Sequence, residues 1–173
     1  MKHTLVARVQ DQPGVLNRVA SLFRRRAFNI DSLTVGQSET PGFSRMTFVV
    51  DAARVPARLV EENLRKLIPV ADVHDVTHVP TVDRDLALIR VSCAPGERAE
   101  IAGLVEIFRG KVVDVASESV IVEVTGDAGK VDGLVELLKP RGLLEMVRTG
   151  KVAMVRGAAA GNGNGANGNG NRS

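Results

Sequence analysis

Apolar side chains recur at every second position near the start of the chain, a spacing that predicts a β-strand. Leu5, Ala7 and Val9 share one face of a strand expected over residues 4–10. After Pro13-Gly14 the spacing becomes helical, and the predicted helix ends in three arginines, where cations favour the negative end of the helix dipole. The apolar face of this helix is expected to hold Val15, Leu16, Val19, Leu22 and Phe23.

Three more strands and a second helix complete the first half of the chain. The pattern predicts strands over residues 29–37 and 43–51, joined by a turn over residues 39–42, and a further strand over residues 70–79. Pro56 begins the second helix. Its core face is expected to hold Leu59, Leu64 and Leu67, with Val60 and Ile68 beside them. The order βαββαβ is typical of the split βαβ, or ferredoxin-like, sandwich.

The same pattern of elements is expected a second time, after a linker over residues 80–85. Strands are predicted over 86–92, 112–116 and 119–126, helices over 97–109 and 129–138, and strand-like segments around Val147 and over 152–155. The expected fold class is therefore α+β, with two ferredoxin-like βαββαβ sandwiches in tandem over residues 1–79 and 86–157. Residues 158–173 are rich in Gly and Asn, lack apolar residues beyond Ala, and are expected to be a disordered tail.

Composition limits how these two units are stabilised. Trp and Tyr are absent and the 173 residues include 5 Phe, so both cores depend on Val, Leu, Ile and Ala. Two small aliphatic cores bury little surface each, which makes association between chains an expected source of stability. The single cysteine, Cys93, allows no intrachain disulfide, and the chain starts without an apolar stretch suited to a signal peptide or a membrane span. These features predict a cytoplasmic protein.

The loop that opens the first helix and the start of the next strand form the candidate binding site. The first N–H groups of a helix lack internal partners and favour a carboxylate, and Gly14 permits close approach. Asp11 accepts hydrogen bonds from an ammonium group, while Asn29 offers a donor and an acceptor. The apolar wall for a branched side chain would consist of Val15, Leu16 and Ile30. The same residues are also common in ordinary turns at helix starts, so residue types alone leave open whether this segment is a binding site or only a turn.

Other clusters carry weaker signals. The arginines at residues 24–26 suggest either a phosphate site or, as we favour, a solvated helix end. His74 and His78 would stand about 13 Å apart on a strand and would meet only on a helix, and no third metal ligand accompanies them. Cys93 is expected to be a buried structural thiol. The net charge of +3 demands no acidic partner, and the lack of Trp and Tyr argues against nucleic-acid binding.

The D-x-P-G-x-L corner from Asp11 to Leu16 resembles that of the ACT domain, an amino-acid-sensing module. Further stretches make the chain similar, over about residues 2–157, to the small regulatory subunit of acetolactate synthase (acetohydroxyacid synthase). These stretches are Leu22-Phe23, Phe28 to Val35, Ser44 to Thr47, Glu106 to Val115, Arg148 to Ala153 and Arg156-Gly157. The Gly/Asn tail lies outside the family pattern.

The resemblance implies a subunit with no active site, cofactor or metal of its own, which forms a homodimer through its ACT domains and binds a large catalytic subunit. That partner would carry thiamine diphosphate, Mg²⁺ and FAD. The small subunit would raise its activity and confer feedback inhibition by valine in branched-chain amino-acid biosynthesis. Valine would lie between two ACT domains, bound by Asp11, Gly14, Val15, Leu16, Asn29 and Ile30.

Two further points follow from the resemblance. Many family members carry Asn at the position of Asp11, and an aspartate cannot donate a hydrogen bond to a carboxylate, so this residue bears on the identity and pose of the ligand. The alternative function is a stand-alone ACT-domain amino-acid sensor that acts on another enzyme or on a regulator of transcription.

Overall fold

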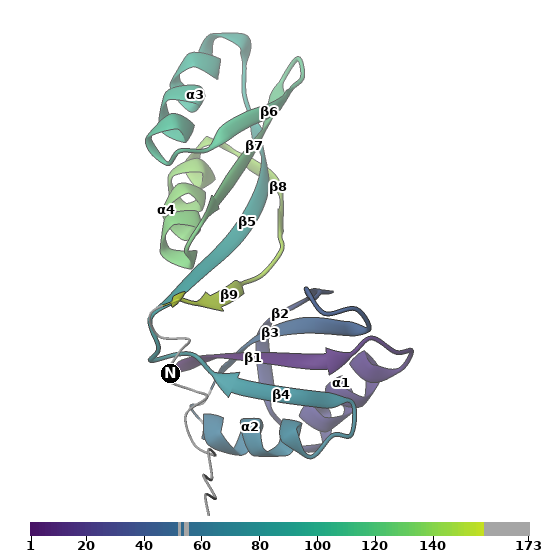
Figure 1. The fold of residues 1–173 in the computed structure, drawn as a ribbon. Coiled ribbons are helices and arrows are strands. Elements are labelled where there is room, and N and C mark those ends of the chain that lie inside the picture. The colour runs from purple at the N-terminus through teal and green to yellow at the C-terminus, as the bar shows by residue number, and fades with distance from the viewer. Residues whose placement is uncertain (52, 54–55, 158–173) are drawn as a thin grey trace, which may run out of the picture.

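The computed structural model describes residues 1–51, 53 and 56–157, which form two units, one above the other in Figure 1. In the first unit the elements are β1 (Lys2–Gln10), α1 (Val15–Arg25), β2 (Asn29–Gln37), β3 (Phe43–Asp51), α2 (Ala57–Arg65) and β4 (Val70–Asp75). In the second they are β5 (Thr81–Ser92), the short 3-10 helix η1 (Pro95–Glu97), α3 (Arg98–Ile107), β6 (Lys111–Val115), β7 (Ser119–Gly126), α4 (Ala128–Leu138), η2 (Lys139–Arg141), β8 (Leu143–Arg148) and β9 (Val152–Val155).

Corresponding strands occupy the same places in the two sheets. The first sheet has the order β2-β3-β1-β4 and the second the order β6-β7-β5-β8, and neighbouring strands are antiparallel. In each unit both helices cover one face of the sheet and leave the other face free of helices (Figure 1). The predicted α+β fold class, with two ferredoxin-like βαββαβ sandwiches, is confirmed.

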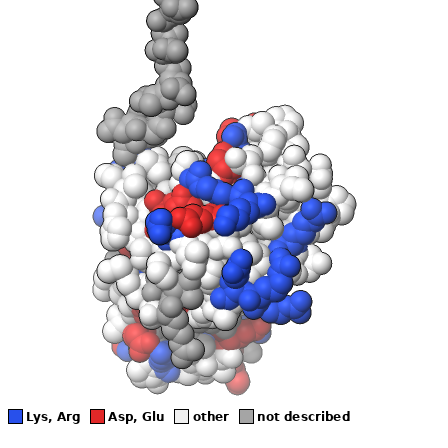
Figure 2. Space-filling model, turned by 90° about the horizontal axis from the view of Figure 1, so that it is seen from below, with Lys and Arg blue, Asp and Glu red and all other residues white. Residues whose placement is uncertain are grey.

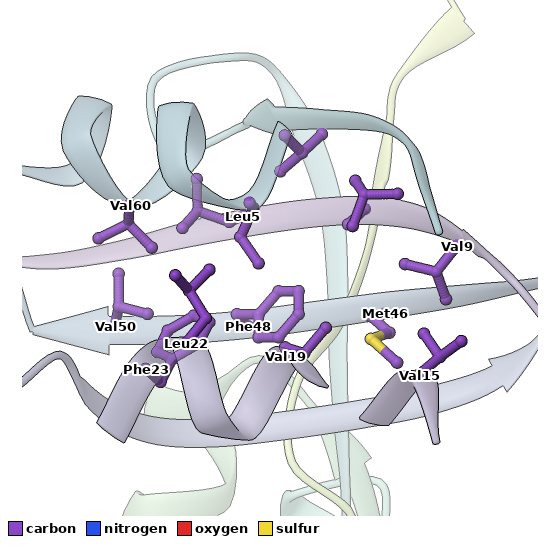
Figure 3. Close-up of a cluster of buried hydrophobic side chains, with 14 residues drawn as sticks. Leu5, Val9, Val15, Val19, Leu22, Phe23, Met46, Phe48, Val50 and Val60 are labelled. Atoms are coloured by element: carbon purple, nitrogen blue, oxygen red, sulfur yellow. The ribbon is translucent and has the colours of Figure 1, made fainter. Parts of the chain in front are cut away.

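Buried apolar side chains fill the space between the first sheet and its helices (Figure 3). Phe48 stacks on Phe23 with ring centroids 5.4 Å apart, and Phe28 meets Phe23 edge-on at 5.6 Å. The predicted apolar face of α1 lies in this core, except that Leu16 is 48% exposed. The second core is aliphatic apart from Cys93, which is buried as expected, and the partly buried Phe108 at its margin.

The core face of α2 is narrower than predicted. Val60 and Leu64 are buried, but Leu59 is 43% exposed and Ile68 is 87% exposed. Leu59 is turned by about 100° from its neighbour Val60, because a helix has 3.6 residues per turn. Ile68 follows the end of the helix, so helical spacing says nothing about the direction of its side chain.

Two predicted boundaries were wrong by four residues or more. Strand β4 ends at Asp75 rather than at residue 79, because the Asp75 carboxylate accepts a hydrogen bond from the N–H of Thr77 at 2.9 Å and so forms a turn. Residues 80–85 are not a linker, since β5 begins at Thr81 and its first four residues pair with β9. The predicted tail, residues 158–173, lies outside the described residues.

The contribution of the turn after β4 to stability can be tested at Asp75. Its carboxylate also lies 2.8 Å from Nδ1 of His3. Burial opposes ionisation of Asp75, but hydrogen bonds from the Thr77 hydroxyl and N–H and from His3 outweigh it and hold its pKa below the ordinary value of 3.8. The stabilisation is therefore complete above that value and is lost as the pH falls through the pKa of the folded state.

We expect Asp75→Asn to reduce the free energy of unfolding by about 1 kcal/mol at neutral pH. The difference from the wild-type chain should shrink in acid, as the wild-type carboxylate becomes protonated. Urea unfolding curves for both chains at about pH 7 and about pH 3 measure it. A difference that is equal at the two pH values would contradict the role of the ionised carboxylate.

Candidate functional site

The loop after β1 leaves the start of α1 open. Gly14 is the N-cap residue, with a φ of +85° that favours glycine, and it offers no side chain to cap the helix. The N–H of Val15 donates to the carbonyl oxygen of Gln12 at 3.3 Å. In the described part of the chain, the N–H groups of Leu16 and Asn17 have no acceptor, and the first turn of α1 has no acidic residue. Among the described residues, these N–H groups at the positive end of the helix are therefore free to bind a ligand.

Two predicted site residues border this open helix end, and a third is mostly internal. Asp11 is exposed, and its N–H donates to the carbonyl oxygen of Gly42 at 2.8 Å. Leu16 presents an exposed apolar side chain. Val15, by contrast, is 6% exposed and belongs to the first core, so most of the apolar contact available at this end comes from Leu16.

Asn29 and Ile30 begin β2. Asn29 is exposed, and its Nδ2 donates to Oδ1 of Asp31 at 3.3 Å. The other oxygen of Asp31 lies 3.2 Å from Nζ of Lys2, which holds this carboxylate in place. Ile30 is half-buried and packs against the first core.

The two halves of the predicted site lie at opposite ends of the sheet. Asn29 pairs with Asp51, the last residue of β3, whereas Gln10 pairs with Phe43, the first residue of that strand. A nine-residue strand separates its ends by about 26 Å at about 3.3 Å per residue. One chain therefore brings together Asp11, Gly14, Val15 and Leu16 but not Asn29 or Ile30.

Strand β2 forms an edge of the first sheet, so its outer N–H and C=O groups are available for pairing with another strand. Val35 on this strand is 44% exposed. Ser32 and Thr34 contact residues 149–151 of the second unit, a role that sequence reasoning missed. Their polar character, alternating with Leu33 and Val35, was the available signal, but it does not identify the partner segment.

The weaker candidates do not converge on a site. His74 lies on β4 and His78 in the following turn, and the described residues hold no group of three or more His, Cys, Asp or Glu side chains suited to a metal. Arg24 and Arg25 are exposed in the last turn of α1, where cations stabilise the helix. Figure 2 shows this helix-bearing side, with basic side chains next to a cluster of mixed charge.

Two βαββαβ units in tandem, with a glycine as the N-cap of the first helix, define an ACT-domain protein. The family model of the AHAS small subunit-like ACT domain matches residues 5–72. The model of the small subunit of acetolactate synthase matches residues 84–157.

Relatives cover nearly the whole of the described chain. The chain is 50% identical over 157 residues to a probable acetolactate synthase small subunit of Archaeoglobus fulgidus, covering 91% of this chain and 98% of that protein. It is 46% identical over 158 residues to the acetolactate synthase small subunit of Bacillus subtilis, covering 91% and 92%. The crystal structure of the small subunit from Thermotoga maritima matches with a TM-score of 0.83 and 42% identity, over 90% of this chain and 98% of that one.

The chain belongs to the family of acetolactate synthase small subunits. These are regulatory, non-catalytic subunits of an enzyme of branched-chain amino-acid synthesis, and membership implies association with the large catalytic subunit. Among the described residues, no helix combines the length and the apolar character needed to cross a membrane.

The positive φ of Gly14 can be tested without a ligand, through the free energy of unfolding of variants at this position. A Cβ added there would meet nothing within 4 Å, so the cost of a side chain is the strain of a positive φ. We expect Gly14→Ala to reduce the free energy of unfolding by about 1 kcal/mol, and Gly14→Asn to cost less.

Gly103 in α3 is the matched control, because a Cβ there also meets nothing within 4 Å but the residue is helical. Gly103→Ala should increase the free energy of unfolding by about 0.5–1 kcal/mol. Urea unfolding of the three variants measures the expected decrease in the free energy of unfolding at Gly14 and the expected increase at Gly103. Equal effects of the two alanine substitutions would show that Gly14 is not strained.

Proposed function

We propose that this chain raises the activity of the large catalytic subunit of acetolactate synthase and makes it subject to feedback inhibition by valine. The open, positive end of α1 carries the proposal. The carboxylate of an amino acid would accept hydrogen bonds from the N–H groups of Leu16 and Asn17, close to Gly14. Thiamine diphosphate, Mg²⁺ and FAD would be bound by the catalytic partner, as the family resemblance implies.

The ammonium group and the branched side chain of valine would also have suitable partners among the predicted site residues of the two chains. Its ammonium group would donate to the Asp11 carboxylate or to the side-chain oxygen of Asn29. Its branched side chain would contact Leu16 and Ile30, with Val15 behind them. In this proposal the ACT domain, residues 1–79, binds the effector.

The site would be completed by a second copy of the chain. Antiparallel pairing of β2 with β2 of the partner about Leu33 would set the partner's Asn29 beside Gln37. Gln37 pairs with Ser44, next to Phe43 and hence at the end of the sheet where the loop after β1 lies. A homodimer of this kind would bring the halves of the site together and would cover the open edge of the sheet.

Regulation follows if valine binds two arrangements of the ACT pair unequally. The favoured arrangement would then become more populated and change the activity of the catalytic subunit. A coupling free energy of about 1–3 kcal/mol is typical of such systems.

A stand-alone ACT sensor is the alternative function, and the match of residues 84–157 to the small-subunit model disfavours it. Recovery of another enzyme, and not the catalytic subunit, in a pull-down would favour it.

The test is a reconstituted assay with the catalytic subunit. We expect the wild-type chain to raise activity and confer valine inhibition, and Gly14→Asp to abolish inhibition while retaining activation, because its carboxylate would repel that of valine. Gly14→Asn has nearly the same shape without the charge and should retain inhibition in part. Wild-type chain that changes neither activity nor valine sensitivity would refute the proposal, and inhibition retained by Gly14→Asp would place the effector elsewhere.

The dimer has its own test. We expect Val35→Glu to shift the chain from dimer to monomer, because it places a charge on the β2 edge, and to weaken valine binding as well. Ile68→Glu is the control, since Ile68 is also exposed but follows α2, at the other side of the sheet. Sedimentation equilibrium and calorimetry with valine give the two readouts. A Val35→Glu chain that stays dimeric would exclude this edge as the interface.

A further inference from the structure

One contact between the two units is a short crossing, residues 149–151, which leads from β8 to β9 above the helix-free face of the first sheet (Figure 1). We propose that this crossing couples the effector site to the C-terminal domain through Ser32 and Thr34 of β2. This inference rests on the proposed function, because it describes how a ligand at the start of β2 would act on the rest of the chain.

The crossing is hydrogen-bonded to β2. The N–H of Lys151 donates to Oγ of Ser32 at 3.1 Å, and Oγ1 of Thr34 donates to the carbonyl oxygen of Thr149 at 3.3 Å. Ser32 and Thr34 are two residues apart on one strand and therefore lie on the same face. The same strand begins at Asn29, the proposed effector contact, so a displacement of its start acts directly on these bonds.

Gly150 allows the crossing to approach β2 this closely. Its φ is +85°, in the region that favours glycine. A Cβ at this position would clash with Oγ of Ser32 and would lie 3.1 Å from Oγ1 of Thr34. Any other residue would therefore displace either the Ser32 hydroxyl or the crossing, so the hydrogen bond from the N–H of Lys151 to Ser32 depends on glycine at residue 150.

On its other side the crossing is fixed to the C-terminal domain. The N–H of Thr149 donates to the carbonyl oxygen of Leu86 at 3.0 Å, and its hydroxyl accepts from the N–H of Leu86 at 3.1 Å. Arg148 donates to the buried Asp85 at 2.9 Å and to Asp132 of α4 at 2.6 Å. Burial opposes the charge on Arg148, but Asp132 and Asp85 outweigh it and raise the pKa of Arg148. Because Asp85 and Leu86 belong to β5 and Asp132 to α4, a shift of the crossing would carry both elements with it.

The surroundings allow such a shift. A β-bulge lies between Ile30 and Ser32, at the point between the effector contact and the crossing, and bulges redirect side chains. Cavities of ≈ 720 Å³ and ≈ 690 Å³ lie beside the contact, the first lined by Ser32 and Lys151 and the second by Thr34 and Val152. Cavities on both sides of the crossing leave room for one domain to tilt on the other.

A second contact would act as the pivot. Ala153 of β9 packs against Val6 and Val76 on the open face of the first sheet. Its carbonyl oxygen accepts a hydrogen bond from Nη2 of Arg45 at 2.9 Å. This contact involves β3, β1 and the turn after β4, and not β2, so it would persist while the crossing moves.

The double variant Ser32→Ala/Thr34→Val removes both hydrogen bonds to the crossing with little change in volume. In full-length chain reconstituted with the catalytic subunit, we expect activation to remain and the valine dissociation constant to stay within about threefold of wild type. The factor by which valine lowers activity should decrease by about fivefold or more. Ser92→Ala/Ser119→Ala, at the far end of the second sheet, is the control and should behave as wild type.

A measurement without ligand separates this inference from the proposed function. Scanning calorimetry should show an unfolding temperature several degrees lower for the Ser32/Thr34 variant than for the wild-type and control chains, because the variant keeps the Ala153 contact but lacks both hydrogen bonds between β2 and the crossing. Gly150→Ala should lower the unfolding temperature in the same way.

The outcomes are distinct. If the Ser32/Thr34 variant binds valine and is inhibited as strongly as wild type, or unfolds at the same temperature as the control, the coupling role of the crossing is overturned. If the wild-type chain does not respond to valine at all, the proposed effector is wrong, and the calorimetric result then decides whether the crossing couples the domains.

Discussion

An open-faced sandwich has helices on one face of its sheet, and the other face needs a cover wherever it carries apolar side chains. In the first unit Val6 and Val76 are buried on that side, and Ala153 of β9 covers them. The cover comes from the end of the described chain, and β9 is itself held by the first residues of β5. Packing of the first unit and placement of the second therefore depend on the same contact.

The length of the sheet imposes the second constraint. The opening of α1 and the start of β2 are separated by the whole of β3, so no side-chain rearrangement within one chain brings them together. A ligand that contacts both must lie where two chains meet. Effector binding and association of the chains would then stabilise each other, because each completes contacts that the other needs.

Local patterns sufficed for most of the fold. The strands over residues 29–37 and 43–51 have the predicted bounds, because alternating side chains and clear turn residues define both ends. The pattern failed where partners are distant in sequence. The polar residues at the start of β5 predict a linker because they match a loop, and the pairing of this segment with β9 has no local signature. The exposure of Ile68 depends on the end of α2 and not on spacing.

The sequence indicates the chemistry of the candidate site but not the placement of its residues. Turn and helix-start chemistry single out Gly14 and Asp11, and the positive φ of Gly14 explains why glycine suits that position. The separation of Asn29 from that corner follows from strand register, which spacing along the chain does not reveal. The contact of Gly150 with Ser32 likewise joins residues far apart in sequence.

The pairing of β5 with β9 limits which recombinations between proteins of this architecture would yield a folded chain. A first unit on its own would expose Val6 and Val76, since the residue that covers them belongs to β9. A C-terminal domain recombined from a relative must therefore bring a β8–β9 segment that fits the recipient sheet, including a glycine opposite Ser32. Recombination between relatives would be tolerated when the breakpoint keeps these surfaces from one parent. The two units would then be inherited together, although each sheet packs a separate core against its own helices.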